Sequence, residues 1–182
     1  WTAIYEQAAK SILARSGQQR GFCVILGSEQ GRLAYELARR STLRIYGVEP
    51  DPAKALAARK ALDRAGLHGS RITILQADPD DMPVSNFFAN LVVSDSLIRD
   101  GSVPVENDGW TRIVKPCGGV VCFAVPSEAA KEHGLTQEKL VSRLAGIGME
   151  ATQTRLQQFP GEEGLLATLT RGKLPGAGDW SH

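Results

Sequence analysis

Short apolar runs that alternate with helix-like stretches constrain the fold of this chain more than any other feature. The first run, Phe22 to Leu26, lies between Gly21 and Gly27, and a helix-like stretch from Arg32 to Arg40 follows it. A continuous apolar run bounded by glycine is typical of a strand that is buried on both faces of a parallel sheet. The alternation therefore predicts an α/β domain with helices on both faces of its sheet.

The same alternation continues through the rest of the sequence. We expect further strands at residues 43–48, 71–76, 88–94 and 120–125, and helices at residues 4–13, 53–65, 108–114 and 136–146. Asp51 and Thr136 are expected to cap the helices that follow them. The last two runs, 149–156 and 165–170, are joined by a loop with Pro160 and Gly161, which predicts an antiparallel pair. The predicted fold is a Rossmann-like, doubly wound three-layer sandwich, with a mostly parallel seven-stranded sheet and an antiparallel final strand.

Composition argues against several classes of function. Of the 182 residues, 42% are hydrophobic, so one domain can bury a complete core, and 21 basic residues balance 20 acidic ones. The sequence also shows no stripe of arginine and lysine residues, so we expect no binding to nucleic acid. No apolar run of the sequence is long enough to span a membrane. The three cysteines and three histidines are scattered, so neither a disulfide nor a metal site is expected.

Three polar features follow the first three predicted strands. The loop from Gly27 to Gly31 has glycines that let a backbone approach a ligand, and it leads into a helix start with free N–H groups. Glu49 lies 22 residues after Gly27, close to the spacing of roughly 20 at which an acid binds ribose hydroxyls. Asp78 follows the third strand and can accept a hydrogen bond from an adenine amino group. Each feature also has a structural interpretation, as a turn glycine, a surface glutamate or a turn aspartate.

In this order the motifs resemble those of the class I S-adenosylmethionine-dependent methyltransferases. Five segments carry the resemblance, which covers about residues 20–171: Val24–Ala34, Gly47–Glu49, Asp78, Phe88–Ser96 and Val114–Val120. It implies that the chain binds S-adenosylmethionine through Gly27, Ser28, Glu29, Gly31, Glu49, Pro50, Asp78, Pro79 and Ser94. Asp95, which follows the fourth strand, is the candidate catalytic base, with a capping or turn aspartate as the alternative.

Three positions depart from the pattern of that family. Ile25 stands where an acid is usual, Glu29 where a second glycine is usual, and Asn90 where an aspartate is usual. The carboxylate of Glu29 either holds the ammonium group of the cofactor or obstructs the site. The sequence therefore leaves two functions open: a methyltransferase with an unidentified acceptor, or a degenerate, non-catalytic binding or structural module. A nicotinamide-dependent oxidoreductase is disfavoured because the chain lacks Gly-x-Gly-x-x-Gly.

The end of the chain has a resemblance of its own. Residues 173–182 are similar to the junction into a pyrroloquinoline-quinone-type β-propeller, and the domain is similar to methyltransferase-like domains embedded in such bacterial proteins. The resemblance implies a domain at residues 1–171, a linker at 172–182 and a covalently fused β-propeller in the parent protein. It does not imply that this chain binds the quinone. An active methyltransferase would be expected in the cytoplasm.

Overall fold

The computed structural model describes residues 2–102, 109–149, 155–158 and 164–176. Its elements are, in chain order, α1 (Thr2–Ser16), β1 (Phe22–Leu26), α2 (Arg32–Arg40), β2 (Arg44–Val48), α3 (Pro52–Arg64), β3 (Ile72–Leu75), the 3₁₀ helix η1 (Pro79–Asp81), β4 (Leu91–Ser94), α4 (Ser96–Asp100), the 3₁₀ helix η2 (Gly109–Ile113), β5 (Val120–Pro126), α5 (Ser127–Glu132), α6 (Gln137–Ala145), β6 (Arg155–Gln158) and β7 (Gly164–Thr170).

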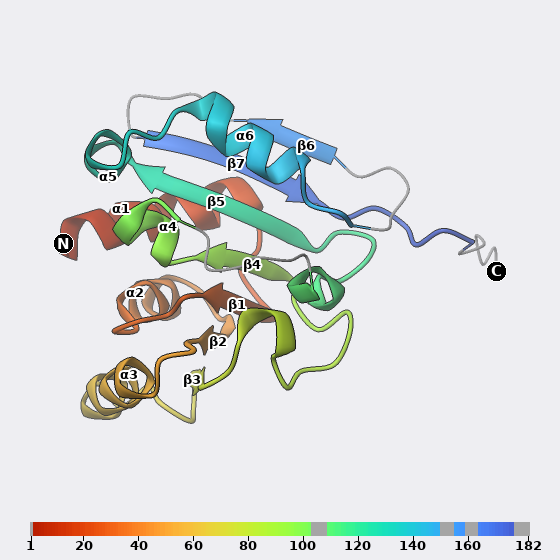
Figure 1. Cartoon of the computed structure of the whole chain (residues 1–182). Coiled ribbons are helices and arrows are strands. Elements are labelled where there is room, and N and C mark those ends of the chain that lie inside the picture. Colours follow the sequence, from red (N-terminus) through yellow and green to blue (C-terminus); the bar gives the residue numbers. More distant parts are fainter. Residues whose placement is uncertain (1, 103–108, 150–154, 159–163, 177–182) are drawn as a thin grey trace.

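The strands form one sheet in the order β3-β2-β1-β4-β5-β7-β6 (Figure 1). Parallel pairs join β3 to β2, β2 to β1, β1 to β4 and β4 to β5. β7 runs antiparallel to both of its neighbours, β5 and β6. The predicted mostly parallel sheet with a reversed final strand is therefore confirmed. The order of the strands reverses between β1 and β4, the kind of switch point at which open α/β sheets bind ligands.

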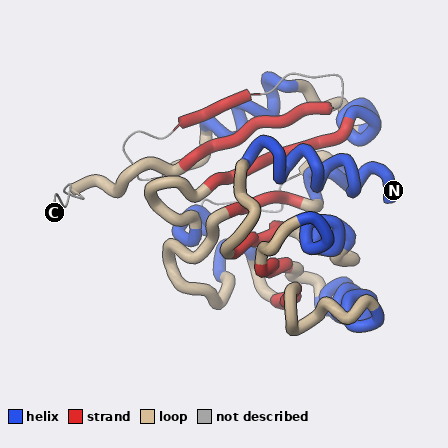
Figure 2. The backbone as a smooth tube through the Cα atoms, turned by 180° about the vertical axis from the view of Figure 1, so that it is seen from behind, coloured by secondary structure: helices blue, strands red, loops and turns tan. Residues whose placement is uncertain are grey.

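Helices cover both faces of the sheet, as the alternation of the sequence predicts. α1 crosses the face that Figure 2 shows in front, where it packs against α2 and β5. α6 covers β7 on the opposite face, in front in Figure 1, and α5 also contacts β7. β4 and β5 are buried along their whole length between these two layers. The core of the domain is therefore the centre of the sheet.

Two predicted helix caps are confirmed. The carboxylate of Asp51 accepts the N–H groups of Ala53 (2.7 Å) and Lys54 (3.1 Å), and Pro52 occupies the first turn of α3. The hydroxyl of Thr136 likewise accepts an N–H at the start of α6. Both caps satisfy helix-start N–H groups that have no partner within the helix.

The structure corrects the prediction in the region of β4. The strand begins at Leu91 rather than at residue 88, and the side chain of Asn90 accepts the N–H of Phe22 (3.0 Å) at the amino end of β1. A 3₁₀ helix, η2, stands where an α-helix was predicted over residues 108–114. α4 and α5 were not predicted, because five or six residues are too few to show a helical period.

Other expectations concern residues near the end of the chain and the cysteines. The predicted strand at 149–156 and the predicted linker at 172–182 fall partly outside the described residues, which omit 150–154 and 177–182. Cys23 and Cys122 are buried free thiols, and burial raises the pKa of each. Within the described ranges, no helix could cross a membrane, and no three metal-binding side chains are grouped together.

Candidate functional site

The register of the sheet brings three loops together at the switch point. The last residues of β1, β2 and β4 lie opposite one another. Gly27, Glu49 and Asp95, which follow them, therefore stand side by side at one rim of the sheet. Gly27 has a φ of 66°, a conformation that glycine adopts without strain.

Glu49 is held in a fixed position at this rim. It is 5% exposed, and its Oε2 accepts the backbone N–H of Glu29 (2.8 Å) while its Oε1 accepts that of Asp51 (3.2 Å). A carboxylate can accept about four hydrogen bonds, so each oxygen keeps a further acceptor position. Two neighbouring hydroxyl groups are donors that such an acid can bind.

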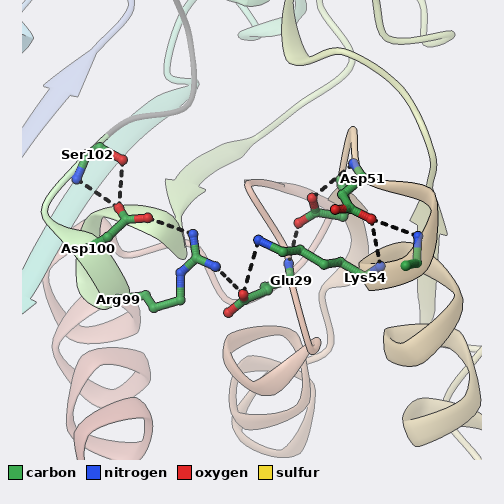
Figure 3. Close-up of polar contacts among 8 residues, drawn as sticks. Glu29, Asp51, Lys54, Arg99, Asp100 and Ser102 are labelled. Carbon is green, nitrogen blue, oxygen red and sulfur yellow. Dashed lines mark hydrogen bonds and ion pairs between the residues drawn. The ribbon is translucent and has the colours of Figure 1, made fainter.

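Glu29 joins the two sides of the rim. Its φ of 35° lies in the left-handed region, in keeping with the glycine usual at this position. Its carboxylate forms ion pairs with Lys54 of α3 (3.3 Å) and with Arg99 of α4, and Arg99 in turn binds Asp100 (2.6 Å; Figure 3). We refer to Lys54, Glu29, Arg99 and Asp100 together as the clasp.

Asp95 lies beside the clasp and lines a pocket of about 190 Å³. The pocket is lined by Tyr5, Glu29, Gln30, Arg32, Asp95 and Arg99. Asp95 is only 1% exposed, and its Oδ1 has no hydrogen-bond partner among the described residues. Burial raises the pKa of Asp95 to about 7, against the effect of a hydrogen bond from the Tyr5 hydroxyl, and the nearby charge of Glu29 adds to the increase. A buried carboxylate with a pKa near neutrality can take up and release a proton.

Asp95 occupies the N-cap position of α4, as the capping interpretation predicts, and its backbone carbonyl accepts the N–H groups of Ile98 (3.0 Å) and Arg99 (3.1 Å). Its side chain makes no capping hydrogen bond to α4. Ser94 does so instead, since its hydroxyl accepts the N–H of Leu97 (3.2 Å) and shares a hydrogen bond with Ser96 (3.0 Å). Ser94 was predicted to bind the cofactor; its side chain is committed to α4, so it would have to bind through its backbone.

Ser28 and Gly31 serve the packing of the glycine-rich loop. Ser28 is fully buried against Gly47 of β2, where an added Cβ would collide with the serine side chain and lie 2.7 Å from Cδ1 of Ile74. Gly31 has a φ of 73°, and a Cβ there would lie 2.9 Å from Leu62. These two predicted ligand-binding residues can meet a ligand mainly through their backbone.

The remaining predicted residues lie near the ends of β2 and β3. Pro50 is exposed next to Glu49. Asp78 opens η1, where its Oδ1 accepts the N–H of Asp80 (2.8 Å), and Pro79 is buried in the first turn. Asp78 is therefore a turn aspartate whose exposed carboxylate also stands at the β3 end of the rim.

Sequence reasoning missed Tyr5 and Arg99. Tyr5 lies on the buried face of α1 with Ala8 and Ile12, at helical spacing, and this signal was present in the sequence. It indicates burial, but it cannot identify a partner 90 residues later in the chain. Arg99 lies on α4, a helix that was not predicted.

Comparisons with known proteins support the fold. No protein-family model and no curated protein matches the chain. Among solved structures it is similar to a "putative s-adenosyl-l-methionine-dependent methyltransferase" from Methanococcus maripaludis, with a TM-score of 0.75 and 22% identity over 96% of this chain and 88% of that one. A SAM-dependent methyltransferase from Aquifex aeolicus gives a TM-score of 0.68 and 12% identity over 93% and 91% of the two chains. The glycopeptide N-methyltransferase MtfA, complexed with S-adenosyl-L-homocysteine, gives 0.68 and 18% over 91% and 89%. The chain thus has the fold of the class I S-adenosylmethionine-dependent methyltransferases.

Proposed function

We propose that this chain binds S-adenosylmethionine along the rim of β1, β2 and β4 and transfers its methyl group to an acceptor. The observation that carries the proposal is the buried carboxylate of Glu49, which two backbone N–H groups hold beside the glycine-rich loop. Its remaining acceptor positions suit the two hydroxyls of a ribose. Asp78, farther along the rim, would then accept the adenine amino group.

The pocket beside Asp95 suits the other end of the cofactor. An amino acid group carries an ammonium and a carboxylate, and the pocket is lined by two carboxylates, Glu29 and Asp95, and two guanidinium groups, Arg32 and Arg99. Such paired charges favour a ligand with both signs. When bound, S-adenosylmethionine supplies a sulfonium with an electrophilic methyl group.

Asp95 would serve as the proton acceptor. Placing the methyl acceptor in line with the methyl group supplies much of the rate in such a transfer. If the methyl acceptor carries a proton on the attacking atom, it must also lose that proton. A base with a pKa of about 7 is well matched to this step near neutral pH. The methyl acceptor would therefore bind on the side of the pocket that Tyr5 and Asp95 line.

A second candidate is a non-catalytic binding or structural module. Two observations favour it: the clasp spans the rim at Glu29, and Ile25, fully buried in β1, supplies no acid. In that case the fold would be kept as part of a larger protein. The β-propeller fusion remains a proposal that rests on the resemblance of residues 173–182.

Calorimetric titration with S-adenosylmethionine, S-adenosylhomocysteine and NAD distinguishes the candidates. Micromolar binding of the first two compounds, and no binding of NAD, is the result expected of a methyltransferase. Glu49→Ala should abolish that binding, whereas Glu138→Ala, which removes an exposed acid on α6, should not. If none of the three compounds binds, the structural module is the better explanation. Unchanged affinity in Glu49→Ala would remove the ribose assignment.

A further inference from the structure

Glu29 makes three separate contacts that hold it in an unfavourable backbone conformation. Its N–H donates to Glu49, and its carboxylate pairs with Arg99 and with Lys54. A non-glycine residue with a φ of 35° is uncommon, and such residues persist where the surrounding structure holds them in place. Strained residues of this kind cluster at binding and switch regions, so the role of Glu29 calls for an explanation.

The Glu29–Arg99 pair lies where a zwitterionic ligand would find its partners. Both side chains line the pocket beside Asp95. Oδ1 of Asp95 is buried and unpartnered among the described residues, so the pocket also holds a free hydrogen-bond acceptor beside the Glu29–Arg99 pair. The Glu29–Arg99 ion pair therefore already occupies the two side chains that would bind the ammonium and the carboxylate of a ligand.

We propose that the clasp is a gate: in the arrangement of Figure 3 its ion pairs occupy the charged side chains of the pocket, and a zwitterionic ligand opens the clasp by exchanging ion pairs. The ammonium of the ligand pairs with Glu29 in place of Lys54 and Arg99, and the carboxylate of the ligand pairs with Arg99 in place of Glu29. No covalent bond changes, and the number of opposite-charge contacts is preserved. The location of the ligand in this inference rests on the proposed function.

Removing Lys54 tests the gate, because the gate predicts that ligand binding becomes tighter rather than weaker. Lys54 pairs with Glu29 on the α3 side and does not line the pocket, so its contact stabilises the closed arrangement alone. Removing it should favour opening and should tighten ligand binding by about 2- to 5-fold, the size expected of one exposed ion pair. If Lys54 instead held the ligand directly, its removal would weaken ligand binding.

The experiment compares two nucleosides by calorimetry. S-adenosylhomocysteine has an amino acid end, whereas 5′-methylthioadenosine has the same adenosine without it. Lys54→Met should tighten S-adenosylhomocysteine binding. Arg99→Met should weaken it at least about tenfold, the loss expected when a charged hydrogen-bond partner is removed, and should not weaken 5′-methylthioadenosine binding. The matched control is Lys10→Met, which breaks the exposed Lys10–Glu6 pair of α1 and should change neither affinity.

A second readout tests the pocket alone. L-methionine at millimolar concentration should shift the Nε–H resonance of Arg99 in NMR spectra of the wild type, and should do so at a lower concentration in Lys54→Met. If S-adenosylhomocysteine fails to bind but L-methionine shifts this resonance, the proposed function fails and the gate stands. If both nucleosides bind equally well and Lys54→Met leaves both affinities unchanged, the gate is overturned and the proposed function stands. Weaker S-adenosylhomocysteine binding in Lys54→Met, or an Arg99 resonance that does not respond to L-methionine, also overturns the gate.

Discussion

The hydroxyl of Tyr5, on α1, donates a hydrogen bond to the carboxylate of Asp95, which follows β4. Both side chains are almost completely buried, and they line the same pocket. The bond favours the charged form of Asp95 and so opposes the larger effect of burial. Burial raises the pKa of Tyr5, and the nearby charge of Asp95, this hydrogen bond and the charge of Glu29 add to the increase. Tyr5 is thus a positioning residue that adjusts the proton affinity of Asp95.

Replacing Tyr5 with phenylalanine should raise the pKa of Asp95 above its value of about 7. A hydrogen bond to a charged group contributes roughly 1.5–3 kcal/mol, so its loss should weaken the acid more than about tenfold. Carboxyl ¹³C NMR during a pH titration measures this directly. Tyr35→Phe on α2 is the control. A midpoint that stays in place or falls would contradict the assigned hydrogen bond.

Asp95→Asn should stabilise the protein, and the gain should grow with pH. The pKa of the buried carboxyl, about 7, lies above the value of roughly 4 in an unfolded chain. Between these values the native state binds the extra proton, so the stability of the wild type falls as pH rises from about 4 to 7. Asparagine has no such dependence. Urea unfolding should show a gain of roughly one to several kcal/mol at pH 8 and little gain near pH 4. A gain independent of pH would show that Asp95 is not buried as a carboxylate.

Gly47→Ala tests the packing of the glycine-rich loop against β2. The added methyl group would collide with Ser28 and lie 2.7 Å from Ile74, so a loss of about 1–3 kcal/mol in the free energy of unfolding is expected. Gly146→Ala is the comparison, because that glycine has a φ of −76° and an added Cβ there meets no atom closer than 3.4 Å. Ser28→Gly should partly rescue Gly47→Ala, since it removes one of the two colliding side chains. Full stability of Gly47→Ala would mean that the loop does not press on β2.

Asp51→Ala should destabilise the start of α3, which carries Lys54 of the clasp. The carboxylate of Asp51 accepts two helix-start N–H groups, and an N-cap contributes about 1 kcal/mol. Faster amide hydrogen exchange at Ala53 and Lys54 would report the loss of the cap. Asp51→Ser keeps a capping oxygen and should retain most of the stability. Equal losses in the two variants would point to a role of the Asp51 charge rather than of the cap.

Local signals predicted the elements whose determining residues lie close together in the sequence. Helix α2 occupies residues 32–40 as predicted, because apolar spacing and flanking glycine act within one turn or two. Asp51 and Thr136 cap their helices as predicted for the same reason. The start of β4 was misplaced because Asn90 bonds to Phe22, a contact across 68 residues that no local pattern records.

The sequence alone determined the alternation of the strands with α1, α2, α3 and α6 and the positions of Gly27, Glu49 and Asp95 after three strands, since hydrophobic period and turn residues are local properties. Only the tertiary structure decided what these side chains touch. The side chain that caps α4 is that of Ser94 rather than that of Asp95, Tyr5 reaches Asp95 from α1, and Glu29 pairs with Arg99 from a helix that was not predicted. The last two of these contacts join segments that packing brings together, and the charge and burial of a pocket exist only once those segments have met.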